Sequence, residues 1–522
     1  MRRINEIKLS PGESEDKIPG KIEKKLKLKP NSIENWRIVR ESVDARKKSD
    51  IKKVYSVDFA LRGEAFEEEK DEEIPFVGPR IKPLVVGFGP CGMFAALYLA
   101  RAGLNPVIAE RGRKIEERVK DVEAFWSDGR LSPVSNVQFG EGGAGTFSDG
   151  KLTTGIKKSN ETRMVLRELV KHGAPPEILY RQNPHVGTDI LREVVVNIRK
   201  EIEDLGGTFL FETLFTGTVR KGGVLTGAEV KTPGGKIEII PADCIVIAPG
   251  HSARDTFRAL YDEGFEMEQK AFSIGARIEH SQKMINESQY GSDEAAKDLG
   301  AASYKLSFRC KNGRGVYTFC MCPGGYVVAS ASEEGGVVTN GMSCHARDGK
   351  NANAALLVGV DPSDFGSDHP LAGIEFQRRW EEAAFRAGGS SYCAPAQLVG
   401  DFMEGRPSEG PGSVLPEYRP GVKWTDLSAC LPDFAAEAMR EALPQLGRKL
   451  KGFDSYDAVL TGTETRSSSP VRILRGENLQ AASLPGVFPA GEGAGYAGGI
   501  MSAAADGLRA AKSIVDSVRL QK

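Results

Sequence analysis

The feature that most constrains this chain is a glycine motif within residues 84–112, LVVGFGPCGMFAALYLARAGLNPVIAERG. A short apolar run of β type precedes Gly87, Gly89 and Gly92, which have the spacing G-x-G-x-x-G. A helix-forming segment and a second apolar strand follow, and that strand ends directly before Glu110. The order strand, glycine turn, helix, strand predicts a Rossmann-type dinucleotide-binding unit.

Each residue of this motif has a predicted physical role. Gly87 permits the tight turn, Gly89 lets the backbone approach a pyrophosphate, and Gly92 lets the helix pack closely on the sheet. The helix N-terminus offers free N–H groups to phosphates. Glu110 is placed to accept hydrogen bonds from a ribose 2′-OH, which favours FAD or NAD over NADP. The neighbouring residues also assigned to the cofactor are Pro90, Cys91 and Arg111.

Overall composition excludes several classes of protein. The 522 residues carry a formal net charge of −1, so no strong overall field favours nucleic acid. Residues 1–18 contain no apolar segment typical of a signal peptide, and no apolar run approaches the roughly 20 residues of a membrane span. The eight cysteines are dispersed without a C-x-x-C pair, so no metal site is predicted. We therefore expect a cytoplasmic protein with no membrane partner.

A small α+β module is predicted at residues 1–75, ending in an acidic linker at residues 64–73. Its Lys/Arg excess suits either RNA or an acidic partner, or a solvated face neutralised by the acidic run. We favour the solvated face, because no RNA-binding signature is present, and nucleic acid is disfavoured as a partner. The predicted elements are strands at residues 4–9, 36–41 and 54–61 and a helix at residues 15–28 that Pro19 and Gly20 interrupt.

A second glycine-rich stretch at residues 136–155 is too rich in glycine for a core helix or strand. Such a segment exposes backbone N–H groups and admits a ligand close to the chain, so we assign it to the cofactor. Phe139 and Phe147 indicate that it is packed down, and polar groups at its exit include Asp149 and Lys151. The residues assigned to the cofactor are Gly140, Gly142, Gly143, Ala144, Gly145 and Thr146.

Three further parts complete the predicted fold, an α/β protein with a discontinuous Rossmann-type FAD-binding domain. A β-meander at residues 219–240 precedes a buried parallel strand that ends at Gly250, a cofactor candidate. A mixed α+β substrate domain is inserted, and a last strand, turn and helix return to the first sheet. The predicted domains are 1–75, 80–265, 266–455 and 456–522, and the cofactor residues of the return are Gly491, Glu492, Gly493, Gly499 and Ile500.

These segments resemble a bacterial and plastid family of uncharacterised FAD-dependent dehydrogenases, within the glutathione-reductase-type flavoprotein superfamily. The matching motifs span roughly residues 80–510 and include VVGFGPCG, FGEGGAGTFSDGKL, IAPGHSARD, SIGARIEH, CMCPGG, ETRSSSPVRI and PAGEGAGYAGGI. Related flavoproteins usually have Asp where this chain has Glu492. The resemblance implies a non-covalent FAD held by the two glycine segments and the Gly491–Glu492 turn.

The predicted function is an FAD-dependent oxidoreductase acting on a small organic molecule, in which the flavin performs hydride or electron transfer. Only one complete strand–G-x-G-x-x-G–helix–strand unit is predicted, so NAD(P)H, a candidate transient electron donor, would have to dock on the substrate domain without that fingerprint. A disulfide reductase of the glutathione reductase kind is disfavoured, since no C-x-x-x-x-C follows the first strand. The alternative is an FAD-containing binding or redox-sensing protein whose N-terminal module contacts RNA or a protein.

The candidate catalytic residues are polar groups in segments predicted to converge on the flavin. Arg466 and Arg472 could clamp an anion or stabilise reduced flavin, although an arginine pair with Glu464 is an equal alternative. His251 could donate a proton or hold its loop by a hydrogen bond. His280 follows Arg277 and Glu279 on a predicted strand edge, and a structural role is favoured for it.

Cys320 and Cys322 have i, i+2 spacing and therefore face the same side of a strand. They could flank the flavin, and Cys322 is included among the catalytic candidates, but a buried strand pair is the favoured interpretation.

Overall fold

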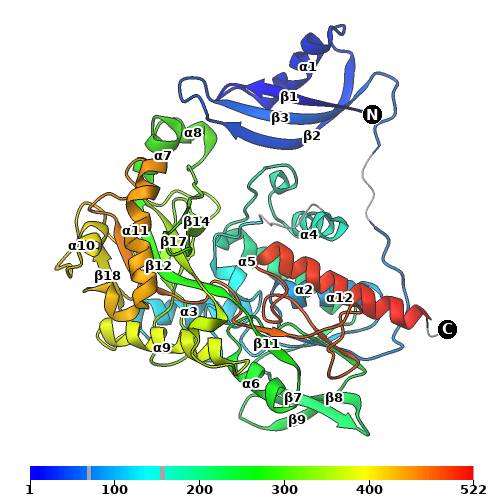
Figure 1. The fold of residues 1–522 in the computed structure, drawn as a ribbon. Coiled ribbons are helices and arrows are strands. Elements are labelled where there is room, and N and C mark those ends of the chain that lie inside the picture. Colours follow the sequence, from blue (N-terminus) through cyan, green and yellow to red (C-terminus); the bar gives the residue numbers. More distant parts are fainter. Residues whose placement is uncertain (68–71, 153–158, 521–522) are drawn as a thin grey trace.

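In the computed structural model, the structure describes residues 1–67, 72–152 and 159–520. Parts of the predicted acidic linker and the last residues of the predicted 136–155 stretch lie outside these ranges. Within them, no helix combines the length and apolar character needed to cross a membrane. Figure 1 shows the N-terminal residues as a separate small layer above the larger body of the chain.

The N-terminal layer is an antiparallel sheet with strand order β1-β3-β2. Helix α1 buries Ile18 and Ile22 against Tyr55 and Val57 of this sheet. The predicted interruption at Pro19 is wrong: a single 3-10 turn precedes α1, and Pro19 lies in its first turn, where a missing N–H costs nothing. The elements are β1 (Arg2–Leu9), α1 (Ile18–Leu26), β2 (Ile33–Asp44) and β3 (Lys52–Leu61).

The glycine motif forms the centre of a five-stranded parallel sheet with strand order β22-β10-β4-β5-β6. Successive side chains of β4 point to opposite faces: Val85 packs against helices, whereas Leu84 and Val86 pack against the β-meander. The strands are β4 (Pro83–Val86), β5 (Val107–Ala109), β6 (Thr208–Leu210), β10 (Cys244–Ile247) and β22 (Val487–Pro489).

Helices α2 (Pro90–Arg101), α5 (Thr188–Asp204) and α12 (Ile500–Leu520) belong to the core on one face of this sheet. Helices α2 and α12 touch closely because Gly507 has no side chain, and a Cβ there would lie 2.0 Å from the Cys91 carbonyl oxygen. The predicted meander is confirmed on the other face as β7 (Leu214–Lys221), β8 (Val224–Lys231) and β9 (Ile237–Pro241). The result is the predicted Rossmann-type layer arrangement.

The inserted part forms a seven-stranded sheet with strand order β13-β14-β17-β12-β20-β18-β19. Its neighbours are antiparallel except for the β18–β19 pair, and helices α9 (Ala372–Ala387) and α11 (Asp433–Lys449) pack into the same core. The predicted mixed sheet with helical cover is confirmed. The strands are β12 (Phe272–Ser281), β13 (Ser307–Arg309), β14 (Gly315–Cys322), β17 (Asn351–Val360), β18 (Ala394–Leu398), β19 (Val422–Trp424) and β20 (Val459–Glu464).

Candidate functional site

A cavity of about 670 Å³ lies where the parallel sheet, the glycine-rich loop and the inserted sheet meet. Its wall includes the first glycine turn, the end of β10, the start of α12 and the end of β14. The cavity therefore joins segments that are hundreds of residues apart in the sequence.

The first glycine turn has the geometry that its spacing predicts. Gly87 has φ +88°, and a Cβ there would lie 2.4 Å from the Ala248 carbonyl oxygen. A Cβ on Gly92 would lie 1.9 Å from the Gly87 carbonyl oxygen, so the start of α2 can pack on β4 only with glycine there. Gly89 faces Gly143 of the second glycine segment, where a Cβ on Gly143 would lie 2.8 Å from the Gly89 Cα.

Glu110 connects the two glycine segments. Its buried carboxylate accepts hydrogen bonds from the backbone N–H groups of Phe88 (2.8 Å), Gly112 (2.9 Å) and Gly140 (3.0 Å). Glu110 also lines the cavity. Three backbone donors thus hold the carboxylate that the sequence predicts for a ribose, and they fix its orientation.

Arg118 organises the glycine-rich loop, and sequence reasoning missed it. Its fully buried guanidinium, on α3 (Ile115–Asp128), donates only to backbone carbonyl oxygens. Because one planar side chain holds several carbonyls, the loop has a defined shape despite its glycines. The signal in the sequence was an arginine within the apolar stripe of a helix. The acceptors are Asn136 (2.9 Å), Val137 (2.9 Å), Gly140 (3.2 Å), Glu141 (2.6 Å) and Gly143 (3.0 Å).

The predicted packing of the loop is confirmed, since Phe139 and Phe147 are both buried. Most of the predicted cofactor residues line the cavity, and five do not. The residues on the wall are Gly87, Gly89, Pro90, Cys91, Glu110, Arg111, Gly140, Gly143, Ala144, Gly145, Gly250, Glu492, Gly499 and Ile500. The residues outside the cavity lining are Gly92, Gly142, Thr146, Gly491 and Gly493.

Two of the five catalytic candidates, His251 and Arg466, line the cavity. Arg472 instead donates to Glu268 (2.8 Å) across the short β11–β21 pair, Met267–Gln269 with Val471–Ile473. His280 is buried in β12, where its Nε2 lies 2.8 Å from the Phe453 carbonyl oxygen and burial lowers its pKa to about 4. A neutral ring donates to that carbonyl, which supports the structural role that the sequence favoured.

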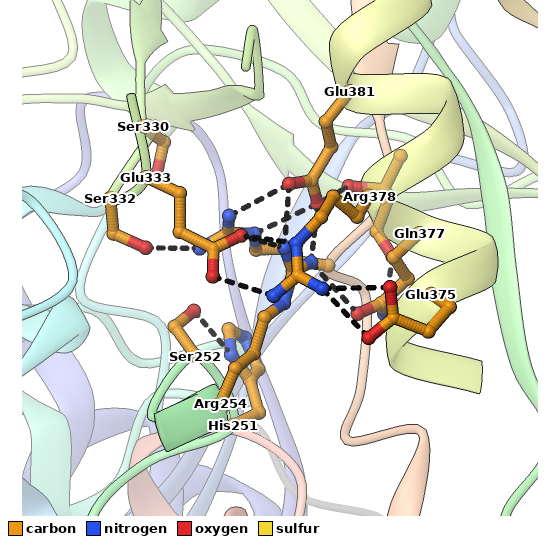
Figure 2. A network of polar contacts seen from close by, with 12 residues as sticks. His251, Ser252, Arg254, Ser330, Ser332, Glu333, Glu375, Gln377, Arg378 and Glu381 are labelled. Atoms are coloured by element: carbon orange, nitrogen blue, oxygen red, sulfur yellow. Dashed lines mark hydrogen bonds and ion pairs between the residues drawn. The ribbon is translucent and has the colours of Figure 1, made fainter. Parts of the chain in front are cut away.

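Arg466 is held by a buried cluster of charges, and the alternative pair with Glu464 is wrong. Glu464 accepts from Arg277 (2.5 and 3.0 Å), whereas Arg466 donates to both oxygens of Glu381 (3.0 and 2.9 Å). Arg254 of α6 (Arg254–Asp262) donates to the same carboxylate (2.7 and 3.0 Å). Figure 2 shows Glu381 reaching Arg254 from its helix, with Glu333 and Ser332 on the facing loop.

His251 lies beside this cluster and is neutral at physiological pH. Burial, with the positive charges of Arg466 and Arg254, lowers the pKa of His251 to about 3. Its Nδ1 lies 3.0 Å from Ser252 Oγ, which itself donates to Gln138 (3.1 Å) (Figure 2). The ring therefore has a fixed orientation at the wall, and its role as a proton donor stays a prediction.

The far end of the cavity contains polar groups that the sequence did not bring together. Lys151, Tyr304, Cys320 and Asn340 line it, from two loops and two different sheets. Tyr304 is 7% exposed, and its hydroxyl has no hydrogen-bond partner among the described residues.

Two family models match separate parts of the chain, and a relative matches its whole length. Residues 271–467 match a family described as FAD-dependent protein, C-terminal domain-like, and residues 1–60 match a domain of unknown function. An uncharacterised protein of Clostridium beijerinckii is 48% identical over 536 residues, covering 100% of this chain and 99% of that protein.

Solved structures with partial likeness are more distant. A geranylgeranyl bacteriochlorophyll reductase-like protein of Thermoplasma acidophilum is 13% identical, with a TM-score of 0.37 over 84% of this chain and 79% of the other. The glycerol-3-phosphate dehydrogenase of Bacillus halodurans, solved with FAD, is 13% identical, with a TM-score of 0.35 over 84% and 64%.

Proposed function

We propose that this chain, which belongs to the same family as the Clostridium beijerinckii protein, is an FAD-dependent oxidoreductase that acts on a small organic molecule. One observation carries the proposal. A single cavity extends from the dinucleotide turn at Gly87 and Gly89, past Glu492 and Gly499, to a polar end at Lys151. A cofactor lying along the glycine segments would therefore have its reactive end near a group of polar side chains.

The wall of the cavity fits a dinucleotide. Gly250, Gly498 and Gly499 line it, and a Cβ added to any of them would meet no atom within 4 Å. The backbone there faces open space and can be approached closely by a ligand. The first turns of α2 and α12 border the same space and offer N–H groups to a diphosphate.

We assign Glu110 and Arg111 to the adenosine end of the cofactor. Gly89, Gly143 and Ala144 are assigned to its diphosphate. Glu492, Gly499 and Ile500 are assigned to the flavin end. Bound FAD would supply hydride or electron transfer at that end. Arg466, held by Glu381, presents a fixed positive charge, which stabilises negative charge that develops nearby.

The inserted domain provides the substrate end of the cavity, through Tyr304, Cys320 and Asn340. This arrangement supports residues 266–455 as a substrate domain, with the other domain limits as predicted above. NAD(P)H as electron donor stays part of the proposal. The alternative of RNA binding by the N-terminal module finds no specific support, because Lys21 pairs with Glu13 there and Asp58 pairs with basic side chains.

The test is to purify the full chain and identify the released cofactor by chromatography after acid treatment. We expect stoichiometric FAD, bleached anaerobically by one of NADH and NADPH and reoxidised by a defined acceptor. Protein that is colourless and takes up no FAD on reconstitution would refute the proposal. Gly222→Ala, in an exposed turn with no atom near the added Cβ, provides a folded control for glycine substitutions in the site.

A further inference from the structure

The end of strand β14 places a pair of cysteines at the substrate end of the cavity. Cys320 is half-buried and lines the cavity, whereas Cys322 is fully buried directly behind it. The Cys322 thiol lies 3.2 Å from the Cys320 carbonyl oxygen and also interacts with the Cys320 thiol. The proposed function gives neither thiol a chemical role.

The backbone between these cysteines is not a regular strand. Pairing with β17 shifts register between Phe319 and Cys322, and Cys320 has φ +42°. A non-glycine residue in the left-handed region is strained, and such strain persists where surrounding contacts impose it. Here Arg277 donates to the Cys320 carbonyl oxygen (2.9 Å), and Lys151 donates to that of Met321.

This irregularity affects what the two thiols can do. In an extended strand, residues i and i+2 lie roughly 6.6 Å apart, close to the upper limit of about 6.8 Å between the Cα atoms of a disulfide. In this chain the register shift and the left-handed Cys320 interrupt the regular strand, and the two thiols lie close enough to interact with each other. A bond between the two sulfurs is therefore within reach of the side chains.

The charges around the pair make the two thiols unequal. The hydrogen bond from Cys322, with the positive charges of Lys151 and Arg277, holds the pKa of Cys320 well below its usual range. The same hydrogen bond and burial raise the pKa of Cys322. Cys320 is therefore the thiol that ionises more readily and Cys322 the one that holds its proton, which is the division between an attacking and a resolving cysteine.

We propose that Cys320 and Cys322 are a redox-active pair that reduces a small disulfide entering the cavity, with Cys320 as the attacking residue. Its thiolate bonds to one substrate sulfur while the substrate S–S bond breaks, and the departing thiolate takes a proton. Cys322 then loses its proton and attacks the Cys320 sulfur, which forms the Cys320–Cys322 disulfide and releases the second substrate thiol. Two protein thiols are oxidised, and one substrate disulfide is reduced.

The return step rests on the proposed function. Reduced FAD would supply the electron pair, and with two protons it would convert the protein disulfide back to two thiols. The pair lies at the end of β14, whereas disulfide reductases of the glutathione reductase kind, which the sequence disfavours, have a C-x-x-x-x-C beside the first strand.

The experiment follows the thiols directly and does not depend on turnover. Reduced full-length protein is exposed anaerobically to buffers of oxidised and reduced glutathione, quenched with acid, alkylated and analysed by peptide mass spectrometry. A Cys344→Ser background is used, because the tryptic peptide of residues 315–347 also contains Cys344. We expect an internal Cys320–Cys322 disulfide that forms and disappears reversibly with the glutathione ratio.

Single variants separate the two roles. Cys322→Ser should trap glutathione on Cys320 as a stable mixed disulfide, and Cys320→Ser should leave Cys322 unreacted. Lys151→Met should shift the pH profile of Cys320 alkylation upward by about one unit, because one positive charge that favours the thiolate is lost. Cys393, half-buried and outside the cavity lining, is the internal reference, and Cys320 should react at least about tenfold faster than it.

The pair is refuted if both cysteines stay reduced at every glutathione ratio, or if Cys320 reacts no faster than Cys393. Circular dichroism and flavin content of each variant show whether a loss of reactivity comes from misfolding. Protein without FAD that still forms the internal disulfide would overturn the proposed function and leave the thiol pair intact. Yellow protein without that disulfide would overturn the pair alone.

Discussion

Replacing Glu381 with glutamine should destabilise the protein by about 3–5 kcal/mol, the usual cost of breaking a buried ion pair by removing one partner. Glu381 is 1% exposed, and its two oxygens accept four hydrogen bonds from Arg254 and Arg466 and one from Thr465 (2.6 Å). Glutamine keeps one acceptor oxygen but directs an N–H₂ group at guanidinium donors and leaves their charge uncompensated.

The magnitude is not the sum of the lost contacts. Hydrogen bonds to charged groups contribute about 1.5–3 kcal/mol each, but five of them share one carboxylate and are not additive. Glu333 also pairs with Arg254 and compensates part of its charge after the substitution. We therefore expect a value within the range for one buried pair, about two to three and a half orders of magnitude in the folding equilibrium.

Urea unfolding followed by circular dichroism measures the effect, with Glu375→Gln as the matched control. The Glu375 side chain is 54% exposed and pairs with Arg378 on the same helix, so its loss should cost less than about 1 kcal/mol. Replacing Arg254, Glu381 and Arg466 together by apolar residues should recover stability, because no buried charge is then left unpaired. Glu381→Gln protein as stable as Glu375→Gln protein would refute the reasoning.

The stability difference between wild type and Glu381→Gln should also depend on pH, in a direction that the pKa of Glu381 determines. The two arginines hold the pKa of Glu381 well below its usual range, more than offsetting the effect of burial. A depressed folded-state pKa contributes stability above the unfolded value of about 4.3, and the contribution is lost as pH falls below it. The difference between wild type and Glu381→Gln should therefore be full at neutral pH and decrease below about pH 4.

Three further substitutions test the glycine segments and the flavin end. Gly143→Ala should weaken FAD binding at least about tenfold, because its Cβ would lie 2.8 Å from the Gly89 Cα at φ +63°; a flavin fluorescence titration showing unchanged affinity would contradict this. Arg118→Met removes the donor to five loop carbonyls, so amide hydrogen exchange in the loop should accelerate at least about tenfold. Unchanged protection would show that the loop keeps its conformation without Arg118. Burial raises the pKa of Glu492 to about 7, so the affinity of wild type for the anionic FAD should fall as pH rises above that value, by up to about tenfold per pH unit. Glu492→Gln should abolish this dependence, and an identical pH profile would exclude Glu492 as its origin.

The local pattern of the sequence determined the parallel unit and the meander. Gly87 and Gly92 could be assigned from spacing alone, because Gly87 has the positive φ that the tight turn requires and Gly92 must leave out a Cβ against the Gly87 carbonyl of the same unit. The meander strands were equally predictable, since Gly pairs at residues 222–223 and 234–235 separate short apolar runs. Periodicity and turn chemistry depend on near neighbours, and near neighbours are visible in a sequence.

Only the tertiary structure decided which charges meet. Arg466 could pair with Glu464, two residues away, but the strand carries Glu464 to Arg277 and α9 brings Glu381 to Arg466. Arg118 looked like an ordinary helical arginine until the carbonyls of a loop about twenty residues later surrounded it. The position of Cys320 at a cavity wall likewise depends on a register shift between β14 and β17. The partner of a long charged side chain depends on which segments pack against it. Those segments lie far from it in the sequence, so the sequence alone does not show which partner it takes.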